Sequence, residues 1–105
     1  MKRTIVSSLA IALLALFAVP ALAGTKTILV KDDFYSPKST TVSSGSTLRF
    51  VWRGDSLHNV VATGPVKFRS SLKRTGSYSK RVTRRGTYTI VCTVHSGMKM
   101  KVVVR

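Results

Sequence analysis

The chain is divided into short segments rich in β-branched and aromatic residues, which are separated by turn sequences. The turns read SPKS, SSGS, RGDS, TGP and RTGS, compositions typical of tight reversals. No sustained apolar period near 3.6 residues occurs, so long amphipathic helices are not expected. We predict an all-β domain with about eight strands, a Greek-key β-sandwich or small barrel with little or no helix. The clearest strands are Thr25–Lys31, Thr47–Arg53, His58–Ala62, Ser77–Arg84, Gly86–Cys92 and Met100–Arg105.

Alternation along Gly86–Cys92 predicts which of its side chains face the core. Successive residues of a strand point to opposite faces, so Tyr88, Ile90 and Cys92 share one face. These three make the better core face, although Val91 on the other face blurs the contrast. Cys92 therefore comes from the core at the end of a strand, where the chain enters a loop. Its thiol is expected at a sheltered rim.

Residues 1–23 have the pattern of a secretory signal peptide. A basic start is followed by the apolar run Ile5–Val19 and by the small-residue sequence ALA that ends at Ala23. A membrane anchor is the second choice, because the run is shorter than the ~20 residues of a spanning helix and no stop-transfer charges follow it. We expect cleavage after Ala23, a single mature domain over residues 24–105, and a periplasmic or otherwise exported location.

The composition is strongly basic. The chain has 18 Lys and Arg against 3 Asp and Glu, for a formal net charge of +15. Such a charge predicts an acidic partner, or a loose association with an anionic surface of the cell envelope. We expect no nucleic-acid partner, because export separates the protein from nucleic acid. The sequence also lacks a basic segment interleaved with aromatic residues of the kind that stacks bases.

Four possible metal donors fall into two short segments. Cys92, His95 and Met98 follow the spacing Cys-x-x-His-x-x-Met, and His58 comes just after the turn RGDS. A single cysteine in an exported chain is an intermolecular bridge, a reactive thiol or a metal ligand. A lone histidine or methionine is more often a surface or core residue, but here both histidines and the only cysteine belong to one set. Two imidazoles, a thiolate and a weak axial thioether form the ligand set of electron-transfer copper.

The two segments resemble the blue copper proteins, the cupredoxin family that includes plastocyanin, pseudoazurin and amicyanin. The resemblance is carried by WRGDSLHNV (residues 52–60) and GTYTIVCTVHSGMKMKVVV (residues 86–104), and FYSP with VSSGSTLRF (residues 34–37 and 42–50) supports it. It implies an eight-stranded Greek-key β-sandwich with one copper ion near one end. The ion would alternate between Cu(I) and Cu(II) as the protein shuttles single electrons between proteins.

The resemblance also implies roles for individual residues. The backbone N–H of Asn59 is expected to approach the cysteine sulfur, while its side chain ties the two ligand segments together. His95 is expected to reach the surface within an apolar patch, to which Gly97, Met98 and Pro65 are candidate contributors, whereas His58 is more buried. Met98 is preferred over Met100 as the axial ligand. The short spacing is amicyanin-like, and the downstream strand places Met98 at the ligand position.

We therefore predict an exported type 1 (blue) copper protein that is not an enzyme, because four protein donors leave no evident position for a substrate. The alternative is a copper-handling protein that carries or delivers the ion, and a third reading is a metal-free module of the same fold. The expected partner of this monomer is an acidic redox protein, such as a c-type cytochrome or an exported oxidoreductase. Lys99 and Lys101 are expected beside the His95 loop, with Lys73 and Arg74 farther away.

Overall fold

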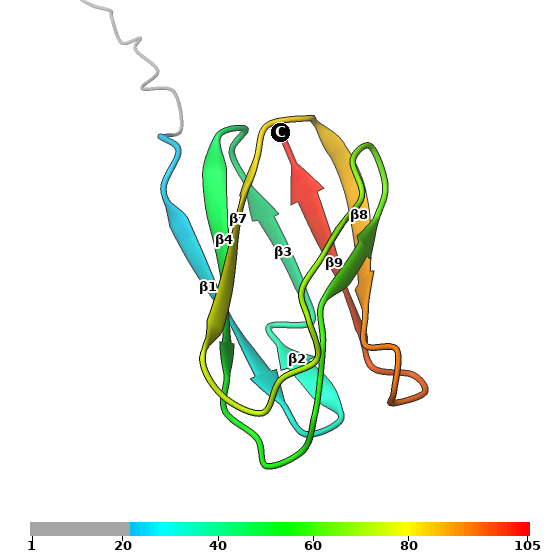
Figure 1. Ribbon diagram of the computed structural model, residues 1–105. Helices are drawn as coiled ribbons and strands as arrows, with labels where there is room; N and C mark the ends of the chain where they lie inside the picture. The colour runs from blue at the N-terminus through cyan, green and yellow to red at the C-terminus, as the bar shows by residue number, and fades with distance from the viewer. Residues whose placement is uncertain (1–21) are drawn as a thin grey trace, which may run out of the picture.

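The computed structural model describes residues 22–105, which form two facing β-sheets (Figure 1). The first sheet has the order β2-β1-β4-β7, with the bounds Phe34–Ser36, Thr25–Lys31, Ser46–Trp52 and Ser77–Val82. The second has the order β3-β9-β8-β5-β6, with the bounds Ser39–Val42, Lys99–Val104, Gly86–Val91, Val61–Thr63 and Phe68–Arg69. Every regular element in this part of the chain is a strand, so the predicted all-β sandwich is confirmed.

Within residues 22–105, five of the eight connections between consecutive strands cross from one sheet to the other, as is usual in Greek-key sandwiches. β1 pairs with β4 in parallel and β3 pairs with β9 in parallel, whereas the other neighbours are antiparallel. The strands that the sequence patterns did not single out are the short ones, β2, β3 and β6. Each has four residues or fewer, too few for alternation to be distinguished from a turn.

The strand predicted over His58–Ala62 is wrong at its start. Only Val61–Thr63 forms β5, and His58 instead makes an isolated antiparallel bridge to Lys73. In that bridge each backbone N–H donates to the other residue's carbonyl at 3.1 Å. The indole Nε1 of Trp52 also donates to the carbonyl of His58 at 3.0 Å. Because the backbone of His58 is held by these partners, it lies outside the sheet ladder.

The core fills the space between the sheets, and the predicted inward face of β8 is confirmed. Tyr88, Ile90 and Cys92 are 1%, 0% and 6% exposed. The same apolar cluster also contains Ile28, Val30, Tyr35, Leu48, Phe50, Trp52, Val60, Met98, Met100, Val102 and Val104. β1, β4 and β8 all run toward one end of the sandwich, the lower end in Figure 1. The loops that follow these strands therefore gather there.

The predicted signal peptide, residues 1–23, lies outside the described residues except for Leu22 and Ala23. Among residues 22–105 there is no helix of the length and apolarity needed to cross a membrane. Gly24 is joined to β4 by a backbone hydrogen bond: its carbonyl accepts from the N–H of Thr47 at 2.7 Å.

Candidate metal centre

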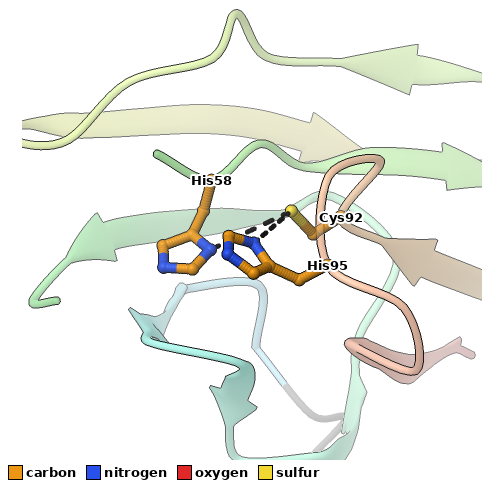
Figure 2. Close-up of side chains that lie close together, drawn as sticks. All are labelled: His58, Cys92 and His95. Carbon is orange, nitrogen blue, oxygen red and sulfur yellow. Dashed lines mark hydrogen bonds between the residues drawn. The ribbon is translucent and has the colours of Figure 1, made fainter. Parts of the chain in front are cut away.

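His58, Cys92 and His95 converge at the end of the sandwich where the loops after β1, β4 and β8 gather (Figure 2). The Cys92 Sγ atom lies 3.9 Å from Nδ1 of His58 and 3.6 Å from Nδ1 of His95. All three donor atoms lie within 4.8 Å of one another, and the two imidazole ring centroids are 4.4 Å apart. Residues separated by 34 positions in the sequence are thus brought into one cluster.

The loop between β8 and β9 positions Cys92 and His95. Cys92 directly follows the last residue of β8, and its N–H donates to the carbonyl of Met98 at 3.0 Å. The N–H of Met98 in turn donates to the carbonyl of His95 at 3.2 Å. Gly97 has a φ of 81°, a conformation that costs glycine little. These contacts close the loop tightly over the cysteine.

The two candidate methionines occupy different levels of the sandwich. β8 and β9 are antiparallel, and Ile90 pairs with Met100 in their register. The backbone hydrogen bond from Cys92 to Met98 continues this ladder by one more inward-facing pair. Both methionines are buried, Met98 at 1% and Met100 at 3% exposure. Met98 therefore lies opposite Cys92 at the rim, whereas Met100 lies opposite Ile90 and deeper in the core.

Two hydrogen bonds join Asn59 to the loop that carries the other donors. Its Nδ2 donates to Oγ1 of Thr93, and the N–H of Thr93 donates to its Oδ1, both at 2.9 Å. The carbonyl of Asn59 accepts a hydrogen bond from the hydroxyl of Tyr35 at 2.7 Å. Burial raises the pKa of the Tyr35 phenol, so it stays a neutral donor. The segment that holds His58 is thereby tied to both the ligand loop and the core.

The surroundings of the two histidines differ as the resemblance implied. The side chain of His58 is 0% exposed, whereas that of His95 is 28% exposed. Val94, next to His95, is 50% exposed, and Leu57, next to His58, is 40% exposed. The expected contribution of Met98 to the surface patch is wrong, because Met98 is 1% exposed. The expectation for Pro65 is also wrong, because Pro65 lies against Gly86 at the start of β8, the opposite end of that strand from the metal centre.

The expected distance of Lys73 from the metal centre is also wrong. The isolated bridge places its backbone directly beside His58. Its ammonium donates to the carbonyl of Ser77 at 2.9 Å and lies 5.2 Å from the ring centroid of Trp52. Arg74 donates to the carbonyl of Asp55 at 3.0 Å, in the turn that precedes His58. Both basic residues therefore belong to the metal end of the molecule.

Two carboxylates next to the histidines were not identified from the sequence. Oδ1 of Asp32 lies 2.8 Å from Nε2 of His58, and Oδ1 of Asp33 lies 3.7 Å from Nε2 of His95. The hydrogen bond with His58, followed by those from the N–H groups of Asp55 and Ser56, lowers the pKa of Asp32 to about 2. The available signal was weak: adjacent aspartates in a chain with only 3 acidic residues.

The donor geometry suits a small metal ion. Nitrogen and sulfur bound to one ion at about 2.0 and 2.3 Å are roughly 3.5–3.7 Å apart for bond angles of about 110–120°. The observed sulfur–nitrogen distances of 3.9 and 3.6 Å are close to these values. Imidazole nitrogen with thiolate sulfur is also a combination that copper favours. The residues present therefore fit a copper ion.

The sequence profile of the cupredoxin-like domain matches residues 4–104 of the chain. The protein is a cupredoxin. This cupredoxin is 34% identical over 84 residues to plastocyanin from Dryopteris crassirhizoma, a match that covers 65% of this chain and 81% of the plastocyanin. The predicted resemblance to the blue copper proteins is thus confirmed.

Solved structures agree with this assignment. The cupredoxin is 27% identical to a reduced Cu(I) form of an amicyanin variant, with a TM-score of 0.68 over 87% of this chain and 88% of that chain. It also superposes on the copper-containing nitrite reductase of Thermus scotoductus SA-01 with a TM-score of 0.70. That second match has 22% identity and covers 94% of this chain but only 25% of the reductase, so it shows the fold alone.

Proposed function

We propose that this cupredoxin is an exported type 1 copper protein that binds one copper ion and carries single electrons between redox proteins. The observation that most supports this function is the convergence of two imidazole nitrogens and one sulfur within 4.8 Å. That donor set is the one used by electron-transfer copper. Membership of the cupredoxin family, with plastocyanin and amicyanin among its relatives, supports the same function.

In this proposal Nδ1 of His58, Sγ of Cys92 and Nδ1 of His95 are the three strong ligands, and the thioether of Met98 is the weak axial donor. Bound copper supplies a one-electron couple between Cu(II) and Cu(I). The chain holds the donors at nearly fixed positions, and the Asn59 hydrogen bonds keep the two ligand segments in register. Burial of His58, Cys92 and Met98 keeps water away from these donors.

His95 is the proposed route for electrons. It is the more exposed of the two histidine ligands, and Val94 beside it offers an apolar contact for a partner. His58 is fully buried and has no path to the surface of its own. An electron that enters or leaves through the edge of the His95 ring therefore has the shortest way through protein.

The proposed protein is an electron carrier and not an enzyme, since four protein donors leave little room for a substrate. One experiment distinguishes an electron carrier from the alternative, a protein that carries or delivers copper. A visible spectrum of the Cu(II)-loaded protein, followed by reversible redox titration, should show intense colour that is lost and regained with one electron. A protein that binds mainly Cu(I) and gives no blue Cu(II) form would instead be a copper-handling protein.

The axial ligand gives a test of the proposed donor set. Met98→Leu should keep the site blue and raise its reduction potential, because a weak thioether tunes the potential more than it holds the ion. Met100→Leu is the matched control, since it removes the same thioether from a position opposite Ile90. Voltammetry of both variants provides the comparison. A potential that moves in Met100→Leu and not in Met98→Leu would assign the axial role to Met100.

We also propose that residues 1–23 are removed as a signal peptide and that residues 24–105 are the mature, exported domain. The composition of the leader supports this, and so does the hydrogen bond between Gly24 and Thr47 at the first residue after the expected cleavage point. Mass spectrometry of protein recovered from an envelope fraction would identify the first residue.

The proposed partner is an acidic redox protein such as a c-type cytochrome. Lys38, Lys99 and Lys101 line one surface depression together with Thr89 of β8 and Met100 of β9, and all three lysines are exposed. Lys99 begins β9, immediately after the ligand loop, so this group of charges is close to the proposed electron route. Opposite charges on a partner would steer the encounter toward that side.

The rate of electron exchange with an acidic c-type cytochrome should therefore fall steeply as ionic strength rises, because such attraction is screened over roughly 8 Å at physiological salt. Reversing Lys99 and Lys101 to glutamate should slow the reaction by roughly tenfold or more at low salt. The matched control reverses Arg84 and Arg85, which are exposed just before β8 at the far end of the sandwich. Equal effects of the two reversals in stopped-flow measurements would favour general envelope retention over local docking.

A further inference from the structure

The buried ring of His58 has two nitrogens with different neighbours. Nδ1 faces the sulfur of Cys92, and Figure 2 shows the other nitrogen, Nε2, directed away from that sulfur. Nε2 lies 2.8 Å from Oδ1 of Asp32, whose side chain is 42% exposed while that of His58 is 0% exposed. The Asp32 carboxylate thus lies between the buried His58 ring and the solvent.

Asp32 is itself held in place by the turn that precedes His58. Both carboxylate oxygens lie 3.0 Å from the N–H of Asp55, and Oδ1 also lies 3.0 Å from the N–H of Ser56. The parallel pairing of β1 and β4 sets this arrangement, since Val30 pairs with Trp52 and the two strands end side by side. The carboxylate therefore has a fixed position beside Nε2 of His58.

Gly54 makes room for this carboxylate. A Cβ at position 54 would lie 2.7 Å from Cγ and 2.9 Å from the backbone N of Asp32, closer than carbon tolerates. The φ of Gly54 is not in the left-handed region, so the requirement for glycine here is one of space. The absence of a side chain at Gly54 is thus a second feature that accommodates Asp32, besides the hydrogen bonds from Asp55 and Ser56.

We infer that Asp32 is a positioning residue for the copper ligand His58, an inference that rests on the proposed function. By accepting a hydrogen bond from Nε2–H, the carboxylate selects the tautomer in which the lone pair of Nδ1 is free and directed at the metal centre. A carboxylate behind a histidine ligand also makes the imidazole a better donor. Its negative charge stabilises Cu(II) over Cu(I), and so lowers the reduction potential.

Asp32→Asn and Asp32→Ala separate the effect of the hydrogen bond on the His58 tautomer from the effect of the negative charge on the reduction potential. Asparagine keeps an acceptor of the same size but removes the charge, so the potential should rise while the tautomer is retained. Alanine removes both, so the potential should rise and the preference for Nε2–H should be lost. The matched control is Asp33→Asn, which removes the same charge at the next position, where the carboxylate is 77% exposed and 3.7 Å from His95.

Two measurements are needed. Voltammetry of the copper-loaded variants gives the potential, and long-range ¹H–¹⁵N correlation spectra of the metal-free protein give the His58 tautomer at mildly alkaline pH, where histidine is ordinarily neutral. We expect a clearly larger rise in potential for Asp32→Asn than for Asp33→Asn, and an Nε2–H tautomer in the wild type that Asp32→Ala loses. If Asp32→Ala does not fold, the near-isosteric Asp32→Asn still tests the effect of the charge, because its reduction potential can be compared with that of Asp33→Asn.

The inference is overturned if Asp32→Asn and Asp33→Asn shift the potential equally, or if wild-type His58 carries its proton on Nδ1. A wild type that shows the expected tautomer but forms no blue copper site would instead refute the proposed function and leave the Asp32–His58 contact established. The two failures are therefore distinguishable.

Discussion

Replacing Cys92 by serine (Cys92→Ser) should abolish the intense visible colour of the Cu(II)-loaded protein, even where some copper still binds. In the blue copper proteins this colour arises from charge transfer between a thiolate sulfur and Cu(II), and Cys92 is the only cysteine of the chain. Only the thiolate form of cysteine is a metal ligand, and serine offers no sulfur in its place. The measurement is a visible spectrum normalised to the amount of bound copper.

Met100→Leu is a suitable control for this experiment, because Met100 is a sulfur-containing side chain buried in the same apolar cluster. It should keep the full colour, which shows that disturbing a neighbouring buried sulfur is not sufficient. A Cys92→Ser protein that remained intensely blue would rule out the thiolate as a ligand and, with it, the proposed type 1 site.

Removing copper should lower the melting temperature by a large amount. A ligand that binds only the folded state, at a free concentration about 1,000 times its Kd, contributes roughly 4 kcal/mol. For a domain of this size each kcal/mol corresponds to about 4–8 °C, so the expected difference is roughly 15–30 °C. His58 lies 34 residues from Cys92 in the sequence, so the unfolded chain does not present the complete donor set together. Thermal unfolding followed by circular dichroism, with and without copper, measures the difference.

The control for thermal stability is copper added to the Cys92→Ser variant, which should shift the melting temperature much less. An equal shift in both proteins would mean that copper stabilises the fold from some other position. The effect matters for this protein in particular, because a chain with one cysteine has no internal disulfide to stabilise its small domain.

Local patterns in the sequence determined the strand class and much of the metal centre. Alternation in Gly86–Cys92 predicted that Tyr88, Ile90 and Cys92 face the core, since the period of two is a property of any extended chain. The spacing of Cys92, His95 and Met98 predicted three donors on one loop, because residues this close in sequence remain close in any fold. The short strands β2, β3 and β6 have too few residues for such patterns.

His58 became a candidate because the chain has only two histidines and one cysteine, which together suit copper, but its exact environment was decided by the tertiary structure. His58 lies in a segment that alternation assigned to a strand, yet the bridge to Lys73 and the Trp52 hydrogen bond remove it from the ladder. Those partners come from other parts of the chain. The same contacts bring Lys73 to the metal end, which its position in the sequence did not indicate.

The contact between Asp32 and His58 was decided entirely by the tertiary structure. Asp32 is 26 residues from His58, and nothing in the intervening sequence specifies that β1 and β4 run in parallel with Val30 beside Trp52. Strand order and register depend on how the nine strands of residues 22–105 share one core, whereas a sequence pattern reports only the few residues around it. For that reason the sequence predicted which side chains could bind copper, and the fold alone determined that the Asp32 carboxylate contacts His58.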